Sequence, residues 1–228
     1  MKEKIIRVYL AAELILLFAI KRSESFSSGF LENIVKYLAI VCSTAVAAFF
    51  FAKKEKGRDR LIAYGLFATA AGDFFLTFLS EERFYLPGIL MFCLVQAFYQ
   101  AWLRPVRGMI AAEAVLFACE LAVLAGAGEL SPVNAAGALD IALLFMNTLA
   151  AWLPGKNRPP VLFRLGIALF LCCDLSLFVR EAASGALSSA ADWLTWICYV
   201  PSQVLITLTY AGGFDKKRNG EEVVEWRV

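Results

Sequence analysis

Residues 161–179 read VLFRLGIALFLCCDLSLFV. The stretch is apolar along almost its whole length, and a helix needs about 20 such residues to cross the hydrocarbon core of a bilayer. In lipid, a helix satisfies all of its own backbone hydrogen bonds, whereas a spanning β-strand alternates polar and apolar residues. The stretch therefore predicts a transmembrane α-helix.

Seven more apolar runs resemble this one. They are Ile5–Ile20, Ile34–Ala52, Leu61–Leu79, Leu86–Leu103, Met109–Ala125, Ala135–Leu153 and Trp193–Gly213. The chain is 60% hydrophobic, against roughly 45–50% in ordinary soluble domains. The sequence predicts an all-α integral membrane protein, a bundle of about eight transmembrane helices. We expect residues 1–213 to form a single transmembrane domain and residues 214–228 to be a short polar tail.

The basic residues predict the orientation of the bundle. If the N-terminus is cytoplasmic, 17 of the 22 Lys and Arg residues fall on the cytoplasmic side. Cytoplasmic loops carry an excess of Lys and Arg, so both termini are expected in the cytoplasm. The membrane is expected to be a bacterial plasma membrane. The run Ile5–Ile20 is expected to be a retained span rather than a signal peptide, because Glu13 interrupts it and no small-residue cleavage pattern closes it.

Composition argues against several classes of site. The basic residues form no continuous stripe, which makes nucleic acid an unexpected partner. The chain has six cysteines, all within apolar runs, and no histidine. Cysteine in such runs is typical of small buried hydrophobic residues, so we expect no metal site and no cofactor.

Two of the runs share a pattern, Gly65-x7-Asp73-x2-Leu76 and Gly166-x7-Asp174-x2-Leu177. Each is followed by a span with a central glutamine, Gln96 or Gln203, and an aromatic residue four positions earlier. The matching spans lie four apart and run in the same direction. The pattern predicts a parallel repeat of two four-helix halves, residues 1–104 and 105–213.

Carboxyl groups inside the spans are the strongest functional signal, because a charge near the bilayer centre costs at least ~2.5 kcal/mol and rarely faces lipid. Asp73 and Asp174 lie at matching depths, about two thirds of the way through their spans. If their helices adjoin, the two carboxyls share one pocket and cannot both ionise cheaply, which provides an acid and a base together. Glu113 and Asp140 lie nearer the ends of their predicted spans and are expected to reach towards the headgroups, while Glu13 and Glu120 are expected to be buried hydrogen-bonding groups.

Other polar residues near the middle of the spans are candidates for substrate binding. They are Gln96, Tyr99, Asn147, Tyr199 and Gln203, with Lys36 at the start of its span. Isolated amides in spans commonly link helices, but this set together with two acids predicts a polar cavity. Lys36 either extends to the headgroups or turns inward towards a carboxylate or a lipid phosphate.

The ordered motifs resemble the YhhN-like family, which includes eukaryotic lysoplasmalogenases. The resemblance rests on Gly72-Asp73-Phe-Phe-Leu76, Gly88-x3-Phe92-x3-Gln96-x2-Tyr99, Gly166-x3-Phe170-x3-Asp174-x2-Leu177 and Tyr199-x3-Gln203-x-Leu205-Ile206, with Lys36 as the early lysine. It implies eight transmembrane helices and hydrolysis of the vinyl ether bond of lysoplasmalogens to a fatty aldehyde and a glycerophospho-alcohol. Gln96 stands where the family usually has a histidine, and Tyr37 stands where a proline often follows the lysine.

Vinyl ether hydrolysis suits these residues because it requires a proton donor, a stabilising carboxylate and a positioned water, as glycoside hydrolysis does. The expected catalytic residues are Asp73 and Asp174, and the expected substrate is a lysophospholipid or another single-chain lipid. Two alternatives stay open, a transporter and a lipid-binding membrane protein without chemistry. The oligomeric state is not indicated by the sequence.

Overall fold

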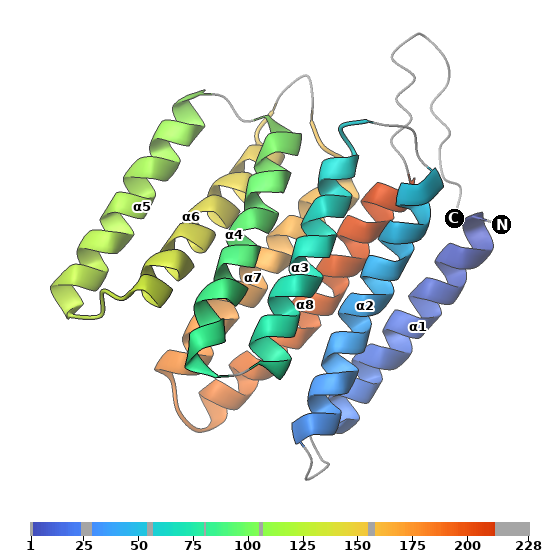
Figure 1. Ribbon diagram of the computed structural model, residues 1–228, viewed down its shortest axis with the longest axis horizontal. Coiled ribbons are helices and arrows are strands. Elements are labelled where there is room, and N and C mark those ends of the chain that lie inside the picture. Colours follow the sequence, from blue (N-terminus) through green and yellow to red (C-terminus); the bar gives the residue numbers. More distant parts are fainter. Residues whose placement is uncertain are drawn as a thin grey trace.

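The computed structural model describes residues 2–23, 29–53, 57–79, 81–104, 107–154 and 158–212. These residues form eight α-helices and contain no strand, which confirms the predicted all-α bundle. The helices are α1 Lys2–Ser23, α2 Gly29–Lys53, α3 Arg60–Phe78, α4 Glu82–Leu103, α5 Arg107–Ala127, α6 Pro132–Trp152, α7 Val161–Ala182 and α8 Ala186–Gly212. Successive helices run in opposite directions, and α5 and α1 lie at opposite edges of the bundle (Figure 1).

Several helices extend beyond the apolar runs that predicted them. α8 begins at Ala186 rather than at Trp193. Its polar first turns are tied back to the end of α7, where Ser188 donates to the Arg180 carbonyl at 3.1 Å and Arg180 contacts Asp192 at 3.2 Å. A helix can extend past the hydrocarbon core in this way because its ends lie among headgroups and water. The predicted end of the last span, Gly213, and the tail 214–228 lie outside the described residues.

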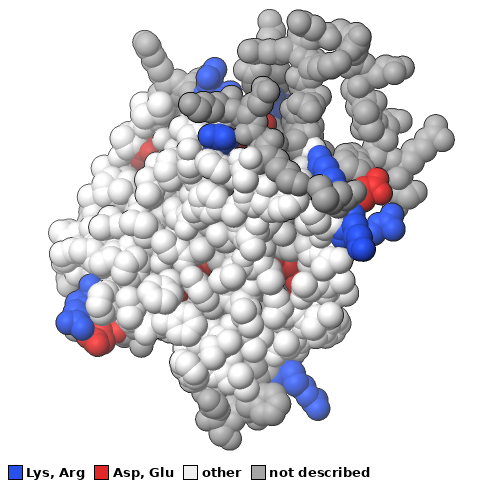
Figure 2. Space-filling model, turned by 45° about the vertical axis from the view of Figure 1, so that its right-hand side comes forward, with Lys and Arg blue, Asp and Glu red and all other residues white. Residues whose placement is uncertain are grey.

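Seven of the eight helices are long and apolar enough to cross a membrane. The exception is α1, which carries charged residues at both ends and Glu13 in its middle. Its outer face is nevertheless apolar, since Val8, Ile15 and Phe18 are each more than 60% exposed. Figure 2 shows a broad belt of uncharged residues with charged side chains gathered towards its two ends, and small acidic areas within it. Such a surface suits an integral membrane protein.

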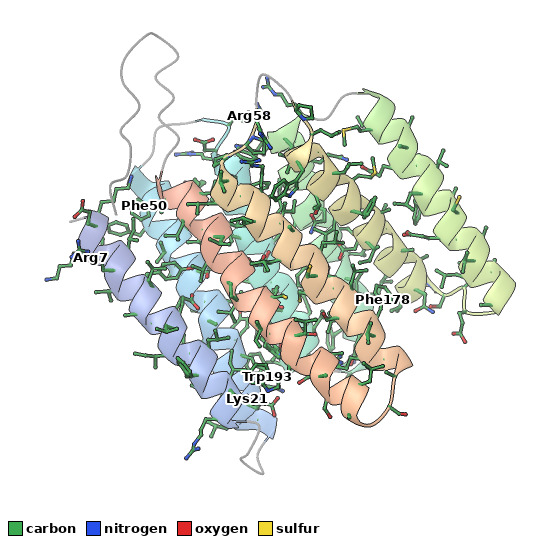
Figure 3. All side chains as sticks on the ribbon, turned by 180° about the vertical axis from the view of Figure 1, so that it is seen from behind. Arg7, Lys21, Phe50, Arg58, Phe178 and Trp193 are labelled. Atoms are coloured by element: carbon green, nitrogen blue, oxygen red, sulfur yellow. The ribbon has the colours of Figure 1, made fainter. Side chains whose placement is uncertain are left out.

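Contacts at both of its ends hold α1 to α8. At one end, Lys2 Nζ donates to the Gly212 carbonyl at 3.0 Å. At the other, Lys21 Nζ lies 4.4 Å from the centre of the Trp193 ring, on the side of the molecule opposite to Arg58 (Figure 3). The start of α1 and the end of α8 therefore lie together, as an even number of crossings requires. Which side of the membrane holds them stays a prediction.

The centre of the molecule is a closed ring of five helices. α3 packs against α4, α4 against α6, α6 against α7, α7 against α8, and α8 against α3. α2 packs on α3 and α8, and α1 packs on α2 and α8, whereas α5 packs on α6 at the far edge. Side chains of the five ring helices that point inward meet one another, and the candidate site lies there.

Close packing of these helices depends on two glycines from the shared sequence pattern. A Cβ atom at Gly65 of α3 would overlap the Tyr99 ring of α4, and one at Gly166 of α7 would lie 2.9 Å from an Ile206 side-chain carbon of α8. Small residues let helix backbones approach closely in membranes. The two glycines thus play similar roles in the α3–α4 and α7–α8 pairs, while the repeat of whole halves stays a prediction.

Candidate functional site

Asp73 and Tyr199 form the first link in the ring interior. The Tyr199 hydroxyl on α8 donates a hydrogen bond to Asp73 Oδ2 on α3 at 2.5 Å. Tyr199 is 5% exposed, whereas Asp73 keeps part of its surface accessible. A hydrogen bond to a carboxylate is shorter and stronger than one between neutral groups. The bond fixes one face of the Asp73 carboxyl and leaves its other oxygen available to a ligand.

Asp174 of α7 approaches the same place from the other side of α8. α3 and α7 each pack against α8, and Tyr199 lies close enough to both aspartates to interact with each of them. The Asp174 and Asp73 carboxyls also interact electrostatically with one another. The two aspartates that the sequence proposed as catalytic therefore lie within electrostatic range of Tyr199 and of each other, while their catalytic role stays a prediction.

Gln96 and Asn147 join α4 to α6 on another wall of the ring. Asn147 Nδ2 donates to the Gln96 backbone carbonyl at 2.9 Å, and lies 3.4 Å from the Gln96 side-chain oxygen. Both side chains are at most 1% exposed. Part of their hydrogen-bonding capacity is unused, because Gln96 Nε2 and Asn147 Oδ1 have no partner among the described residues.

Tyr99 and Gln203 are buried with even fewer partners. The Tyr99 hydroxyl, Gln203 Nε2 and Gln203 Oε1 make no hydrogen bond to any described residue. Gln203 is 1% exposed and lies one turn beyond Tyr199 on α8. Buried polar atoms are nearly always paired with protein or ordered water. These atoms therefore favour a polar ligand or water in the ring interior.

Lys36 lies outside this group. It forms an ion pair with Glu32 one turn earlier on α2, and its Nζ is 4.6 Å from the centre of the Trp196 ring. Trp196 in turn packs edge-on against Tyr199, with ring centres 5.9 Å apart. The lysine is therefore placed at the rim, one aromatic ring away from the Asp73–Tyr199 pair.

The expectation for Asp140 is wrong. Asp140 does not extend to the headgroups, because it is 8% exposed in the middle part of α6 and its Oδ1 has no partner among the described residues. It interacts electrostatically with Asp174. The apolar run begins at Ala135, whereas α6 begins at Pro132, and this places Asp140 deeper. The Ser131-Pro132 pair is a helix-start signal that could have revealed this depth.

Two of the remaining acids take structural positions, whereas the hydrogen bond expected of Glu120 is not seen, because its buried Oε2 has no partner among the described residues. Glu13 is 3% exposed and accepts a hydrogen bond from Ser43 at 3.1 Å, as expected of a buried hydrogen-bonding group. Glu113 of α5 accepts a hydrogen bond from Gln100 of α4. Both lie away from the Asp73–Tyr199 pair.

The fold and this cluster define an integral membrane protein whose helical bundle encloses a site of acidic and neutral polar side chains. The chain belongs to the YhhN family, whose sequence model matches residues 31–210. That match spans nearly all of α2 to α8 and confirms the resemblance seen in the ordered motifs. Neither a curated protein nor a solved structure matches the chain.

Proposed function

We propose that this protein is a membrane-embedded hydrolase that cleaves the vinyl ether bond of lysoplasmalogens. The observation that carries the proposal is the juxtaposition of Asp73 and Asp174 across Tyr199. Two carboxyls in an apolar bundle offer a proton donor and a carboxylate side by side. The resemblance to lysoplasmalogenases supplies the substrate class.

In the first step, an aspartic acid protonates the vinyl carbon that is remote from the ether oxygen. The π electron pair of the double bond forms the new C–H bond, and the adjacent carbon becomes an oxocarbenium ion with the ether oxygen. We assign the donor role to Asp174 and the stabilising role to Asp73. Asp73 suits the latter because it accepts the Tyr199 hydrogen bond, which favours a charged acceptor.

In the second step, water adds to the oxocarbenium carbon, and the proton that it loses returns to the carboxyl site. The resulting hemiacetal collapses to a fatty aldehyde and an alcohol on the glycerol, so one water molecule is consumed per bond cleaved. Gln203 suits the binding of this water because both of its polar atoms are buried and have no partner among the described residues. Gln96, Asn147 and Tyr99 offer further unused polar atoms in the same ring.

Lys36 suits the headgroup of the lipid. Its ammonium group lies at the rim of the cluster beside Trp196 and is paired with Glu32. A lipid phosphate would replace Glu32 as its partner, because phosphate oxygens bind ammonium groups strongly. The single chain of the substrate would remain in the lipid or between helices.

The test is incubation of the purified protein with three matched lysophospholipids that carry a 1-alkenyl, 1-alkyl or 1-acyl chain. Fatty aldehyde is expected from the alkenyl lipid alone, because only a vinyl ether gives an oxocarbenium ion on protonation. Aldehyde should appear in equal amount to the released glycerophospho-alcohol. Absence of aldehyde from alkenyl lipids with several headgroups would remove the proposal and favour transport or lipid binding.

A further inference from the structure

We propose that Asp140 is a third carboxyl of this site, a positioning residue that shares one proton with Asp174 and keeps Asp174 ready to donate it. The catalytic meaning of this pair rests on the proposed function, but the existence of the pair does not. Its basis is the placement of the two residues on neighbouring helices.

The two carboxyls lie at corresponding positions along neighbouring helices. Asp140 is the ninth residue of α6, and Asp174 is the ninth residue from the end of α7. α6 and α7 run antiparallel and pack against each other, so each residue lies about 12 Å along its own helix from the helix end on the same side of the bundle. The electrostatic interaction between the two carboxyls agrees with this position.

Asp140 also faces into the ring. It lies two turns before Asn147 on α6, and residues seven apart share one face of a helix. Asn147 hydrogen-bonds to Gln96 of α4, which fixes the direction of that face. One turn before Asp140 on the same face, the Ala136 carbonyl accepts a hydrogen bond from Cys93 of α4 at 3.4 Å. Asp140 therefore lies on the inner wall, below the Asn147–Gln96 link.

Among the described residues, the groups around the pair include no cation. Asp174 is close to Cys173 on its own helix, Asp73 on α3 and Tyr199 on α8. Asp140 is within electrostatic range of Cys93 on α4. The helix α5 also packs on α6, and its acids are Glu113, which hydrogen-bonds to Gln100 of α4, and Glu120. No ion pair formed by the described residues includes Asp73, Asp140 or Asp174. Nor do the described residues hold three or more His, Cys, Asp or Glu side chains placed to bind a metal ion.

Sharing of a proton follows from this environment. Two carboxylates at close range in an apolar interior repel each other strongly, whereas one acid and one carboxylate share a proton at little cost. Such a pair loses its protons in two separate steps that belong to the pair. During turnover, Asp174 transfers its proton to the vinyl carbon, and the proton released by the attacking water is taken up again by the pair.

The test that does not depend on activity is an infrared pH titration of the carboxylic acid C=O band in the purified protein. The intensity of this band is followed against pH in the wild type and in a double variant, Asp140→Asn with Asp174→Asn. We expect the difference between the two titration curves to show two separated steps. Each single variant should retain one step, displaced from both. Asp192→Asn, which removes an acid near the start of α8, should leave the two steps unchanged. If Asp140→Asn does not fold, Asp140→Glu should retain two steps with altered spacing.

Two results would overturn the pair. In one, each acid titrates at the same pH whether or not the other is present. In the other, Asp140→Glu leaves both steps unchanged.

A measurement of turnover against pH distinguishes a failure of the carboxyl pair from a failure of the proposed reaction. Asp140→Asn removes the group that holds the proton on Asp174, so the fall in turnover at alkaline pH should begin at least about one pH unit lower. A loss of structure alone would lower turnover at every pH without shifting the pH at which turnover begins to fall. If turnover of Asp140→Asn began to fall at the same pH as in the wild type, the positioning role would be contradicted. If the wild type releases no aldehyde, the proposed function fails, and the infrared titration still decides whether the pair exists.

Discussion

Tyr199 donates a hydrogen bond to Asp73 at 2.5 Å, and the two residues are 126 positions apart in the chain. The bond joins α8 to α3 inside the five-helix ring. α8 is also the helix that contacts α1, α2 and α7. The last helix of the bundle therefore organises the site that the earlier helices line.

Removal of the Tyr199 hydroxyl tests this arrangement. Tyr199→Phe keeps the ring that packs on Phe170 and Trp196 but removes the donor to Asp73. A hydrogen bond to a charged group contributes about 1.5–3 kcal/mol, so we expect turnover to fall about 10- to 100-fold. The measurement is the rate of aldehyde release at saturating substrate.

The matched control is Tyr64→Phe, also a hydroxyl deletion. Tyr64 lies on α3 with Asp73 but is 38% exposed and packs on Phe51 and Phe98. Its turnover should equal that of the wild type. Equal activity of Tyr199→Phe and Tyr64→Phe would show that the bond to Asp73 plays no part in turnover.

Substitution by leucine should affect the stability of the protein differently at Gln203 and at Asn147. Gln203 has no hydrogen-bond partner among the described residues, so Gln203→Leu should not lower the thermal stability in detergent. Asn147 bonds to Gln96, so Asn147→Leu should cost about 0.5–1.5 kcal/mol. If Gln203 positions water, its variant folds normally but turns over slowly. A destabilised Gln203→Leu protein with unchanged turnover would assign Gln203 a structural role instead.

Gly65 tests the close approach of α3 and α4. Gly65→Ala would place a methyl group in the Tyr99 ring, and overpacking of this kind typically costs about 1–3 kcal/mol. Gly137→Ala on α6 meets no atom within 4 Å and should be neutral or slightly stabilising. Melting temperatures of the two variants in the same detergent check the difference. A Gly65→Ala protein as stable as Gly137→Ala would mean that the helices can separate at no cost.

Orientation in the membrane is testable with reporter fusions. Lys2 contacts the end of α8, so reporters at the two termini should read the same side. The 17-to-5 distribution of basic residues predicts that this side is the cytoplasm. A fusion after Lys217 should therefore read cytoplasmic, and one near Glu129 should read external. An external signal after Lys217 would contradict the predicted topology.

The sequence predicted the eight helices because the thickness of the hydrocarbon core sets the length of each apolar run. Asp73 and Asp174 are candidates on the sequence alone, since acids stand out within such runs, and their catalytic role stays a prediction. Asp140 was misplaced because its depth depends on where α6 begins, and Ser131 caps that helix by accepting from the Asn134 amide at 3.1 Å. Apolar length alone does not define a capped start.

Pairwise contacts could not be predicted. Nothing in the runs indicates that Tyr199 reaches Asp73, or that Lys36 pairs with Glu32 on its own helix. Such contacts depend on which helices adjoin and how each is rotated. In an apolar span, a single polar residue gives little information on rotation because lipid and protein interiors are similarly apolar.

The most direct measurement of the central claim is aldehyde release from a 1-alkenyl lysophospholipid by Asp73→Asn and Asp174→Asn. Asparagine keeps the size of the side chain and removes its proton chemistry, so each variant should fold and lose about 10²–10⁴-fold in turnover. Glu113→Gln, at the α4–α5 contact outside the cluster, should retain the wild-type rate. Release of aldehyde by both aspartate variants at the wild-type rate would contradict the two-carboxyl site.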